Sequence, residues 1–259
     1  MAISPSKNKP LPKSAEKVFY YVSDKWYKGE QPTFYDEDKL PATAILKLNF
    51  EEIKKEIETY YAKNSAELKP NFTPYSYNEQ GWKTVNLYSY FLKYPENCKK
   101  FPKLDRIANQ IPGMCLAQIA VLEPGTTIKS HIGDTDAIIR SHLGIKIPGT
   151  LPDCGLRIRS EDRAWKEGEV FSFCIVHRHK AWNLTDDYRI ILMIDVIRDE
   201  HFEKRYWIAG KTLAVIAMKF FATKFPFLKK MPVPLTHCIH FFTGIFFWLR
   251  LRFQLLTGI

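Results

Sequence analysis

Short runs of alternating apolar and polar residues fill the middle of the chain, and clusters of Gly, Pro and Asp separate them. A period of two is typical of β-strands with one buried face. Strand-like segments of this kind lie at 114–128, 143–149, 154–160, 169–176 and 189–197. Their spacing is typical of a sandwich or barrel. We therefore expect a mainly β core of the jelly-roll type.

Apolar residues with a helical period precede these strands. The clearest helix is predicted within 40–63, where Ile53 and Ile57 share an apolar stripe. Asn49 is its candidate N-cap, because a short amide side chain can accept a hydrogen bond from the first turn. A shorter helix is expected within 101–113, ending before its Pro-Gly pair. The jelly roll should therefore carry flanking helices on its N-terminal side.

The pattern divides the chain into three parts. Residues 1–39 should form an N-terminal arm with a short helix within 17–29. Residues 40–205 should form the jelly-roll domain, and 206–259 a helical extension that is both apolar and basic. At 259 residues the chain is long enough for one large domain with such extensions.

The extension 206–259 changes the expected partner. It contains seven Lys or Arg and no Asp or Glu, so it holds most of the formal net charge of +10. Its basic residues lie among Trp, Phe, Leu and Ile, which favours a membrane surface over nucleic acid. We expect 207–230 to lie in a bilayer interface and 231–259 to form a shallow or re-entrant anchor rather than a span. The alternative is that both segments pack on the core or form a dimer face.

The cysteines and the N-terminal residues indicate the cellular compartment in which the protein is expected. The five cysteines are odd in number and form no CxxC pair, which favours reduced, buried thiols over a disulfide framework. Residues 1–17 are basic but lack the apolar region of a secretory signal. We expect a cytoplasmic protein, either free or held at the membrane by 206–259.

Two histidines far apart in the sequence are each followed by an arginine nine or ten residues later, His131 by Arg140 and His179 by Arg189. Imidazole is a good ligand for Fe(II). The planar arginine head group grips a carboxylate at two points, so two arginines suit a dicarboxylate. His142 could donate a further hydrogen bond to the same ligand. Together these groups describe the site of an iron and 2-oxoglutarate oxygenase.

The spacings around these residues occur together as His131-x-Gly133, Arg140-x-His142-Leu143-Gly144, Trp165-x-x-Gly168 and His179-x-x-Trp182-Asn183, followed by Arg189 and LMIDV. This arrangement resembles the aspartyl/asparaginyl β-hydroxylase family over roughly residues 80–200, most strongly over 113–199. The resemblance implies a double-stranded β-helix, which is a cupin-like jelly roll. It also implies that the protein uses Fe(II), 2-oxoglutarate and O2 to hydroxylate an unactivated C–H bond.

The resemblance assigns a role to each site residue. It implies that His131 and His179 ligate the iron. It implies that Arg140 and His142 hold the 2-oxoglutarate carboxylate next to the metal, and that Arg189 holds the distal carboxylate.

Neighbouring residues need separate assignments. His177 lies two residues before His179 and would share its face on a strand, but the family's spacing to Arg189 selects His179 as the ligand. His177 could line the pocket or simply pack. Trp182 and Asn183 match the family motif, and we assign them to shaping the pocket.

Three positions depart from the resemblance. Gly133 stands where many iron oxygenases have a carboxylate ligand. Animal members also have Gly there and lipid A acyl hydroxylase relatives have Asp, so water should complete the iron sphere, with Asp134 or Asp136 as the alternative. Residues 174–176 replace acidic residues that precede the second histidine, and Ala120 replaces a serine that helps to hold 2-oxoglutarate.

We therefore expect an Fe(II)/2-oxoglutarate-dependent dioxygenase that hydroxylates the β-carbon of an Asp or Asn residue, or of a related amino acid. Gly133 favours this substrate class, whereas the extension 206–259 favours a lipid acyl-chain hydroxylase acting at a membrane. A catalytically weakened, membrane-tethered binding module is the remaining alternative. No nucleic-acid partner is expected.

Overall fold

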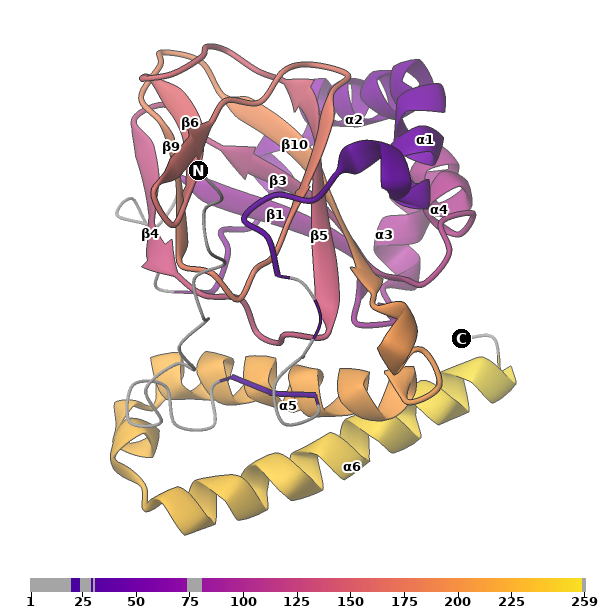
Figure 1. Ribbon diagram of the computed structural model, residues 1–259, viewed down its shortest axis with the longest axis vertical. Coiled ribbons are helices and arrows are strands. Elements are labelled where there is room, and N and C mark those ends of the chain that lie inside the picture. Colours follow the sequence, from indigo (N-terminus) through magenta and orange to yellow (C-terminus); the bar gives the residue numbers. More distant parts are fainter. Residues whose placement is uncertain (1–19, 24–28, 30, 74–80, 258–259) are drawn as a thin grey trace, which may run out of the picture.

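The computed structural model describes residues 20–23, 29, 31–73 and 81–257. Its core is a pair of antiparallel β-sheets (Figure 1). The larger sheet has the strand order β2-β1-β3-β10-β5-β8. Its strands are β1 (Trp82–Ser89), β2 (Leu92–Lys93), β3 (Met114–Leu122), β5 (Ile138–Lys146), β8 (Val170–Phe173) and β10 (Arg189–Ile197). The expected mainly β core is confirmed.

The smaller sheet has the strand order β4-β9-β6-β7. Its strands are β4 (Thr126–His131), β6 (Cys154–Ile158), β7 (Glu161–Arg163) and β9 (His179–Asn183). The chain passes back and forth between the two sheets, so that β4 and β9 pair across a long sequence separation. Apolar side chains such as Ile128, Leu156, Phe173 and Ile191 fill the space between the sheets. This is the jelly-roll arrangement that the alternating pattern predicted.

Four helices cover the outer face of the larger sheet: α1 (Pro41–Leu48), α2 (Phe50–Asn64), α3 (Pro95–Lys100) and α4 (Pro102–Ala108) (Figure 1). Ile53 and Ile57 of α2 are buried against this sheet, as their stripe predicted. Short 3-10 turns lie nearby at η1 (Glu37–Lys39) and η2 (Ser65–Glu67). The strands of the larger sheet are therefore buried on both faces, which explains why β3 and β10 are apolar almost throughout.

Asn49 does not act as the predicted N-cap. It separates α1 from α2 as a single residue, and its side chain makes no capping hydrogen bond to α2. Its Nδ2 instead donates to the Ile45 carbonyl at 2.8 Å and closes α1. The predicted start of the helix at Asn49 is therefore confirmed, but the predicted capping hydrogen bond is absent because the side chain is used at the end of α1. The helix expected within 17–29 lies mostly outside the described residues, and in its described part Tyr21 forms an isolated bridge with Thr135.

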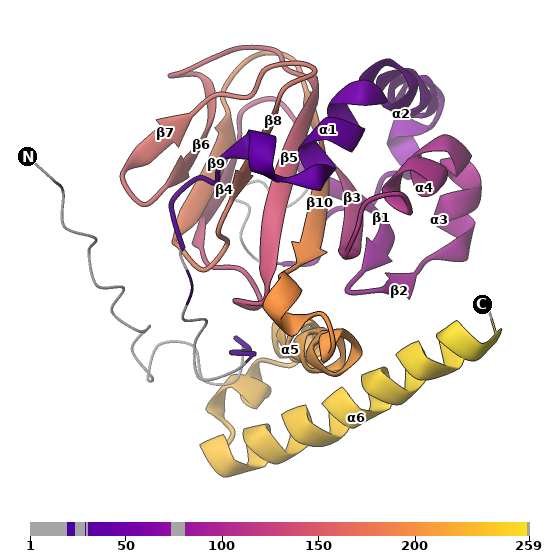
Figure 2. The same ribbon diagram turned by 45° about the vertical axis from the view of Figure 1, so that its right-hand side comes forward.

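A helical hairpin follows the β-core. After η3 (Asp199–His201), α5 (Arg205–Lys224) crosses one end of the sheets, and Ile208 and Leu213 join the apolar cluster between them. After η4 (Pro226–Lys230), α6 (Val233–Thr257) runs along the side of α5 that faces away from the sheets (Figures 1 and 2).

The two helices of the hairpin touch at a pair of glycines. A Cβ on Gly210 would lie 2.8 Å from the Gly244 carbonyl oxygen and 2.9 Å from the backbone nitrogen of Trp248. Only glycine permits this approach, so the crossing point is fixed by sequence. Among the helices of the described residues, none is both long and apolar enough to cross a membrane.

Candidate functional site

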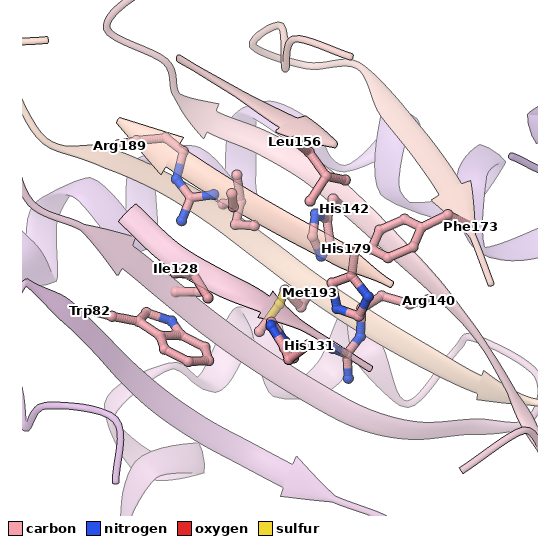
Figure 3. A pocket seen from close by; sticks show the side chains of 13 residues that line it. Trp82, Ile128, His131, Arg140, His142, Leu156, Phe173, His179, Arg189 and Met193 are labelled. Atoms are coloured by element: carbon pink, nitrogen blue, oxygen red, sulfur yellow. The ribbon is translucent and has the colours of Figure 1, made fainter. Parts of the chain in front are cut away.

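His131 and His179 are a directly opposed cross-strand pair. His131 ends β4, His179 begins β9, and the two are register partners in the smaller sheet. Their ring centroids lie 4.3 Å apart. The pairing of β4 with β9 thus brings together two imidazoles that are 48 residues apart in the sequence (Figure 3).

Both imidazoles are held in the form that binds a metal. Nδ1 of His131 lies 2.8 Å from the Lys129 carbonyl, and Nδ1 of His179 lies 2.8 Å from the His177 carbonyl. A carbonyl only accepts, so each Nδ1 carries the proton and each Nε2 keeps a lone pair. Burial lowers the pKa of His131 to about 4 and that of His179 well below its usual value, so both rings are neutral at physiological pH. Neutral imidazoles oriented by a backbone carbonyl are typical of metal ligands.

Arg189 is a buried cation that faces the same pocket from the start of β10. Its side chain is 1% exposed, and its nearest charge-stabilising contact is the ring of Trp165, 4.5 Å from the guanidinium carbon. Within the described residues its Nε has no hydrogen-bond partner and no carboxylate forms an ion pair with it. Burial lowers the pKa of Arg189 to about 10, which still leaves it protonated at neutral pH. A buried charge without a partner is costly, so this position indicates an anionic ligand.

His142 offers a hydrogen-bond donor in the same space. The Trp165 indole Nε1 donates to its Nδ1 at 3.3 Å, so Nδ1 is the acceptor and Nε2 carries the proton. That Nε2 is buried and has no partner in the described part of the chain. Burial, with nearby Arg140 and Arg189, holds the pKa of His142 well below its usual value. The ring is therefore a neutral donor, suited to a carboxylate oxygen.

Arg140 is already engaged on one side. It lies opposite Asp195 in the register of β5 and β10, and its Nε and Nη2 each donate to that carboxylate at 2.7 Å. Although burial opposes it, the Asp195 carboxylate raises the pKa of Arg140 above its ordinary value. Nη1 is the nitrogen left for a ligand. Asp195 thus fixes the direction in which Arg140 enters the pocket.

The five predicted site residues line one pocket between the two sheets (Figure 3). Sequence reasoning missed most of the remaining walls, which are apolar or aromatic: Trp82, Ile128, Leu156, Phe173, Ala181, Ile191 and Met193. Trp82 also lines a second, wider cavity. These residues look like ordinary core positions in the sequence, so no pattern marks them. Their effect is to keep the pocket poor in water.

The wider cavity is a groove of about 330 Å³ that reaches His131 and Arg140. Polar side chains of β1 and β3 line one side of it, among them Asn86 and Gln118. Residues of α5, including Lys219, line it as well. The groove therefore connects the candidate metal position with the C-terminal hairpin.

Gly133 stands where many iron oxygenases have a carboxylate ligand, and the Ile175 side chain occupies the space that a side chain at position 133 would need. A Cβ on Gly133 would lie 2.1 Å from Ile175 Cδ1 and 2.7 Å from Ile175 Cβ. Asp134 pairs with Lys219 at 2.9 Å, and Asp136 accepts two hydrogen bonds from Ser23. In the described part of the chain no cluster of three or more His, Cys, Asp or Glu could hold a metal. Gly133 and Ile175 both depart from the family pattern, and their shapes are therefore complementary.

Three residues near the motif act outside the pocket. The Nε2 of His177 lies 2.9 Å from the Gln31 carbonyl, and the ring does not line the pocket. Trp182 Nε1 donates to the Pro152 carbonyl at 2.6 Å, and Asn183 Nδ2 donates to the Leu122 carbonyl at 3.0 Å. Trp182 and Asn183 therefore tie the surrounding loops to the sheets rather than line the pocket.

Comparison with known proteins identifies the class. The family described as aspartyl/asparaginyl beta-hydroxylase matches residues 47–199, more than half of the chain. The chain belongs to this family. The expected resemblance over residues 80–200 is confirmed, and the match begins earlier, within α1.

Three curated relatives show the range of the family. The ornithine lipid ester-linked acyl 2-hydroxylase of Rhizobium tropici is 29% identical over 180 residues, which cover 67% of this chain and 63% of that one. The human aspartate beta-hydroxylase domain-containing protein 2 is 32% identical, covering 64% of this chain and 47% of that one. The human aspartyl/asparaginyl beta-hydroxylase is 31% identical over 124 residues, covering 46% and 16%. The chain matches less than two thirds of the length of each.

Among solved structures the chain is similar to a Pseudomonas putida prolyl-4-hydroxylase. The sequence identity is 17%, the TM-score is 0.40, and the match covers 61% of this chain and 88% of that one. The fold assignment rests on the strand order and pairing described above.

Proposed function

We propose that this protein is an Fe(II)/2-oxoglutarate-dependent dioxygenase that hydroxylates an unactivated C–H bond. The observation that carries the proposal is Arg189, a buried cation that has no carboxylate partner among the described residues and shares a pocket with the paired imidazoles of His131 and His179. A neutral histidine pair suits a divalent metal, and an unpaired buried guanidinium suits a carboxylate. Family membership supports the same chemistry.

The residues present fit both groups. Nε2 of His131 and of His179 would hold the iron, because each Nδ1 is already committed to a backbone carbonyl. Arg189 would bind the distal carboxylate of 2-oxoglutarate in a dry environment where the ion pair is strong.

The opposite end of the cosubstrate would meet two donors. His142 Nε2–H and Arg140 Nη1 would hold the carboxylate next to the metal, and Asp195 would keep Arg140 oriented. When bound, Fe(II) and 2-oxoglutarate would activate O2, so that one oxygen atom would enter the substrate C–H bond and the other would enter succinate as 2-oxoglutarate loses CO2. The apolar side chains of Phe173 and Met193 would exclude water from this reaction.

An anaerobic titration with Fe(II) and 2-oxoglutarate tests the proposal. A visible absorption band should appear, and in air succinate should form. His131→Ala should abolish the band, whereas Arg189→Ala should weaken 2-oxoglutarate binding by about a hundredfold and leave metal binding largely intact. If both variants bound metal and cosubstrate like wild type, the site assignment would be wrong. No band at millimolar cosubstrate would favour the weakened binding module, whereas a band without succinate in the absence of substrate would leave only the substrate to be identified.

We propose an Asp or Asn side chain, or a related amino acid, as the first substrate class, because the family is named for that reaction. A lipid acyl chain is the second candidate, favoured by the α5 side of the groove, where Leu213 and Ile216 offer apolar contacts.

A direct assay separates the two classes. Purified protein would be offered Asp- and Asn-containing peptides and, separately, acyl amphiphiles, and each product would be examined by mass spectrometry for one added oxygen. Oxygen gained only by acyl substrates would exclude the amino-acid class, and the reverse result would exclude the lipid class.

A further inference from the structure

The outward face of α6 is apolar along its whole length. Nearly all exposed large apolar side chains of the described residues belong to 221–256, and only Leu48, Phe72, Leu184 and Phe202 lie elsewhere. Seven of them repeat at steps of four and three residues and form one continuous stripe: Leu235, Ile239, Phe242, Phe246, Leu249, Phe253 and Leu256. The most exposed of these, Leu256, is 87% exposed. A continuous exposed apolar stripe along a whole helix marks an interaction surface.

Further apolar groups widen the stripe into a broad face. Phe241 on α6 is exposed beside it, and Phe225 and Phe227 are exposed at η4. A coiled-coil partner needs only a narrow seam of residues at the first and fourth heptad positions. The observed face is wider than such a seam and rich in Phe, which suits a fluid apolar layer better than a single helix.

Positively charged side chains lie at both ends of this face. Lys224, Lys229 and Lys230 lie at the turn between the helices, and Arg252 lies near the far end of α6. Residues 206–259 contain no Asp or Glu. Two copies of the hairpin would therefore repel each other, whereas an anionic surface would attract each of them.

We propose that the outward face of α6, together with η4, binds the surface of an anionic lipid bilayer. The Phe and Leu side chains enter the acyl boundary, and the lysines and Arg252 contact the lipid phosphates. The inner side of α6 is committed to α5 through the Gly210–Gly244 contact, so the hairpin docks as one unit.

Docking would place the substrate groove beside the bilayer. α5 lies between α6 and the β-core (Figure 2). The Leu213, Ile216 and Lys219 side chains of α5 line the groove. A single helix, about 10 Å thick, would separate the lipid surface from the groove. Lipid binding does not itself depend on the proposed hydroxylase activity, so each can fail without the other.

Flotation of the full chain with lipid vesicles tests the proposal. Wild type should float with vesicles of phosphatidylcholine and phosphatidylglycerol and much less with phosphatidylcholine alone. Replacing Phe242 and Phe246 by Asp should weaken binding by about a hundredfold, because two exposed aromatic side chains no longer enter the lipid. The control is Leu48→Asp, which changes a still more exposed apolar residue on α1 and should float like wild type.

The remaining measurements concern the lysines, the lipid charge, a second copy of the chain and the folding of the variants. Replacing Lys224, Lys229 and Lys230 by Gln should reduce flotation and remove its dependence on salt. Equal binding of wild type to neutral and anionic vesicles would overturn the anionic part of the proposal. A dimer in sedimentation that becomes a monomer on Phe242→Asp, without lipid binding by wild type, would show that a second copy covers this face. Unchanged melting temperatures and wild-type 2-oxoglutarate binding would show that the variants remain folded.

Discussion

Arg189 is the residue whose environment most clearly requires a ligand. Its guanidinium is buried beside Trp165, its Nε has no partner among the described residues, and burial lowers its pKa without neutralising it. Ala120 lines the same pocket, from the strand next to β10. Ala120 stands where the family resemblance places a serine that would share the carboxylate. The proposed cosubstrate site thus has its cation but lacks one neutral donor.

Restoring that donor should tighten cosubstrate binding. We expect Ala120→Ser to increase 2-oxoglutarate affinity by about fivefold, the value of roughly one added hydrogen bond. Anaerobic calorimetry with Fe(II) present would measure it. Ala181→Ser is the matched control, because Ala181 lines the pocket from the smaller sheet and should not add a contact to the distal carboxylate. An unchanged or weaker affinity for Ala120→Ser would count against the placement of that carboxylate.

Gly133 and Ile175 give a second prediction at this scale. Gly133→Asp should destabilise the protein by about 3 kcal/mol, because its Cβ would overlap the Ile175 side chain. The additional change Ile175→Ala should remove the overlap, recover most of the melting temperature and tighten Fe(II) binding by adding a carboxylate ligand. Calorimetric melting and metal titration would measure both effects. If Gly133→Asp alone were as stable as wild type, Ile175 would not be what excludes a carboxylate here.

At the scale of the element, strand register builds the site. One pairing, β4 with β9, places His131 opposite His179, and another, β5 with β10, places Arg140 opposite Asp195. A shift of one residue in either pairing would turn these side chains to the other face of the sheet. The apolar strands β3, β5 and β10, buried between helices and pocket, hold that register.

The Arg140–Asp195 pair should be strongly coupled. Asp195→Leu leaves Arg140 buried without its counter-charge, and we expect a loss of about 3 kcal/mol and a melting temperature lower by about 6–10 °C. The double variant Arg140→Met with Asp195→Leu should recover most of this loss, since no buried charge remains. A double-mutant cycle followed by thermal melting measures the coupling. Additive effects of the single changes would show that the pair contributes no coupling energy.

At the scale of the whole molecule, residues from two parts of the chain line the groove. The family match ends at residue 199, yet α5 begins after it and lines the groove beside β1 and β3. Lys219 of α5 pairs with Asp134, three residues after His131, with side-chain exposures of 13% and 27%. The C-terminal hairpin is therefore coupled to the segment that carries a candidate iron ligand.

Breaking that contact should affect substrate more than cosubstrate. We expect Lys219→Met to raise the substrate KM several-fold and to lower the melting temperature by about 3 °C, the effect of losing roughly 1 kcal/mol. Binding of 2-oxoglutarate should stay unchanged, because Lys219 does not line the inner pocket. Lys219→Arg is the control that keeps the charge. Equal KM values for Lys219→Met and wild type would mean that the hairpin does not help to shape the groove.

The sequence alone determined the β-rich core, the flanking helices and the set of five polar residues that meet in the pocket. His131, His179, Arg140, His142 and Arg189 were predicted as one set, and the structure brings them into one pocket. Apolar runs with a period of two, and residue types that bind metals or carboxylates, are local signals. They can therefore be recognised in the sequence without knowledge of the fold. The roles assigned to these five residues stay predictions until metal and cosubstrate binding are measured.

The tertiary structure decided what depends on contacts between distant residues. It committed Arg140 to Asp195, filled the space beside Gly133 with Ile175, and moved the Asn49 hydrogen bond from α2 to α1. It also made α5 a wall of the groove and left the face of α6 exposed. None of these features can be predicted from the spacing of residues along the chain. Each depends on which surfaces come into contact when the sheets and helices pack.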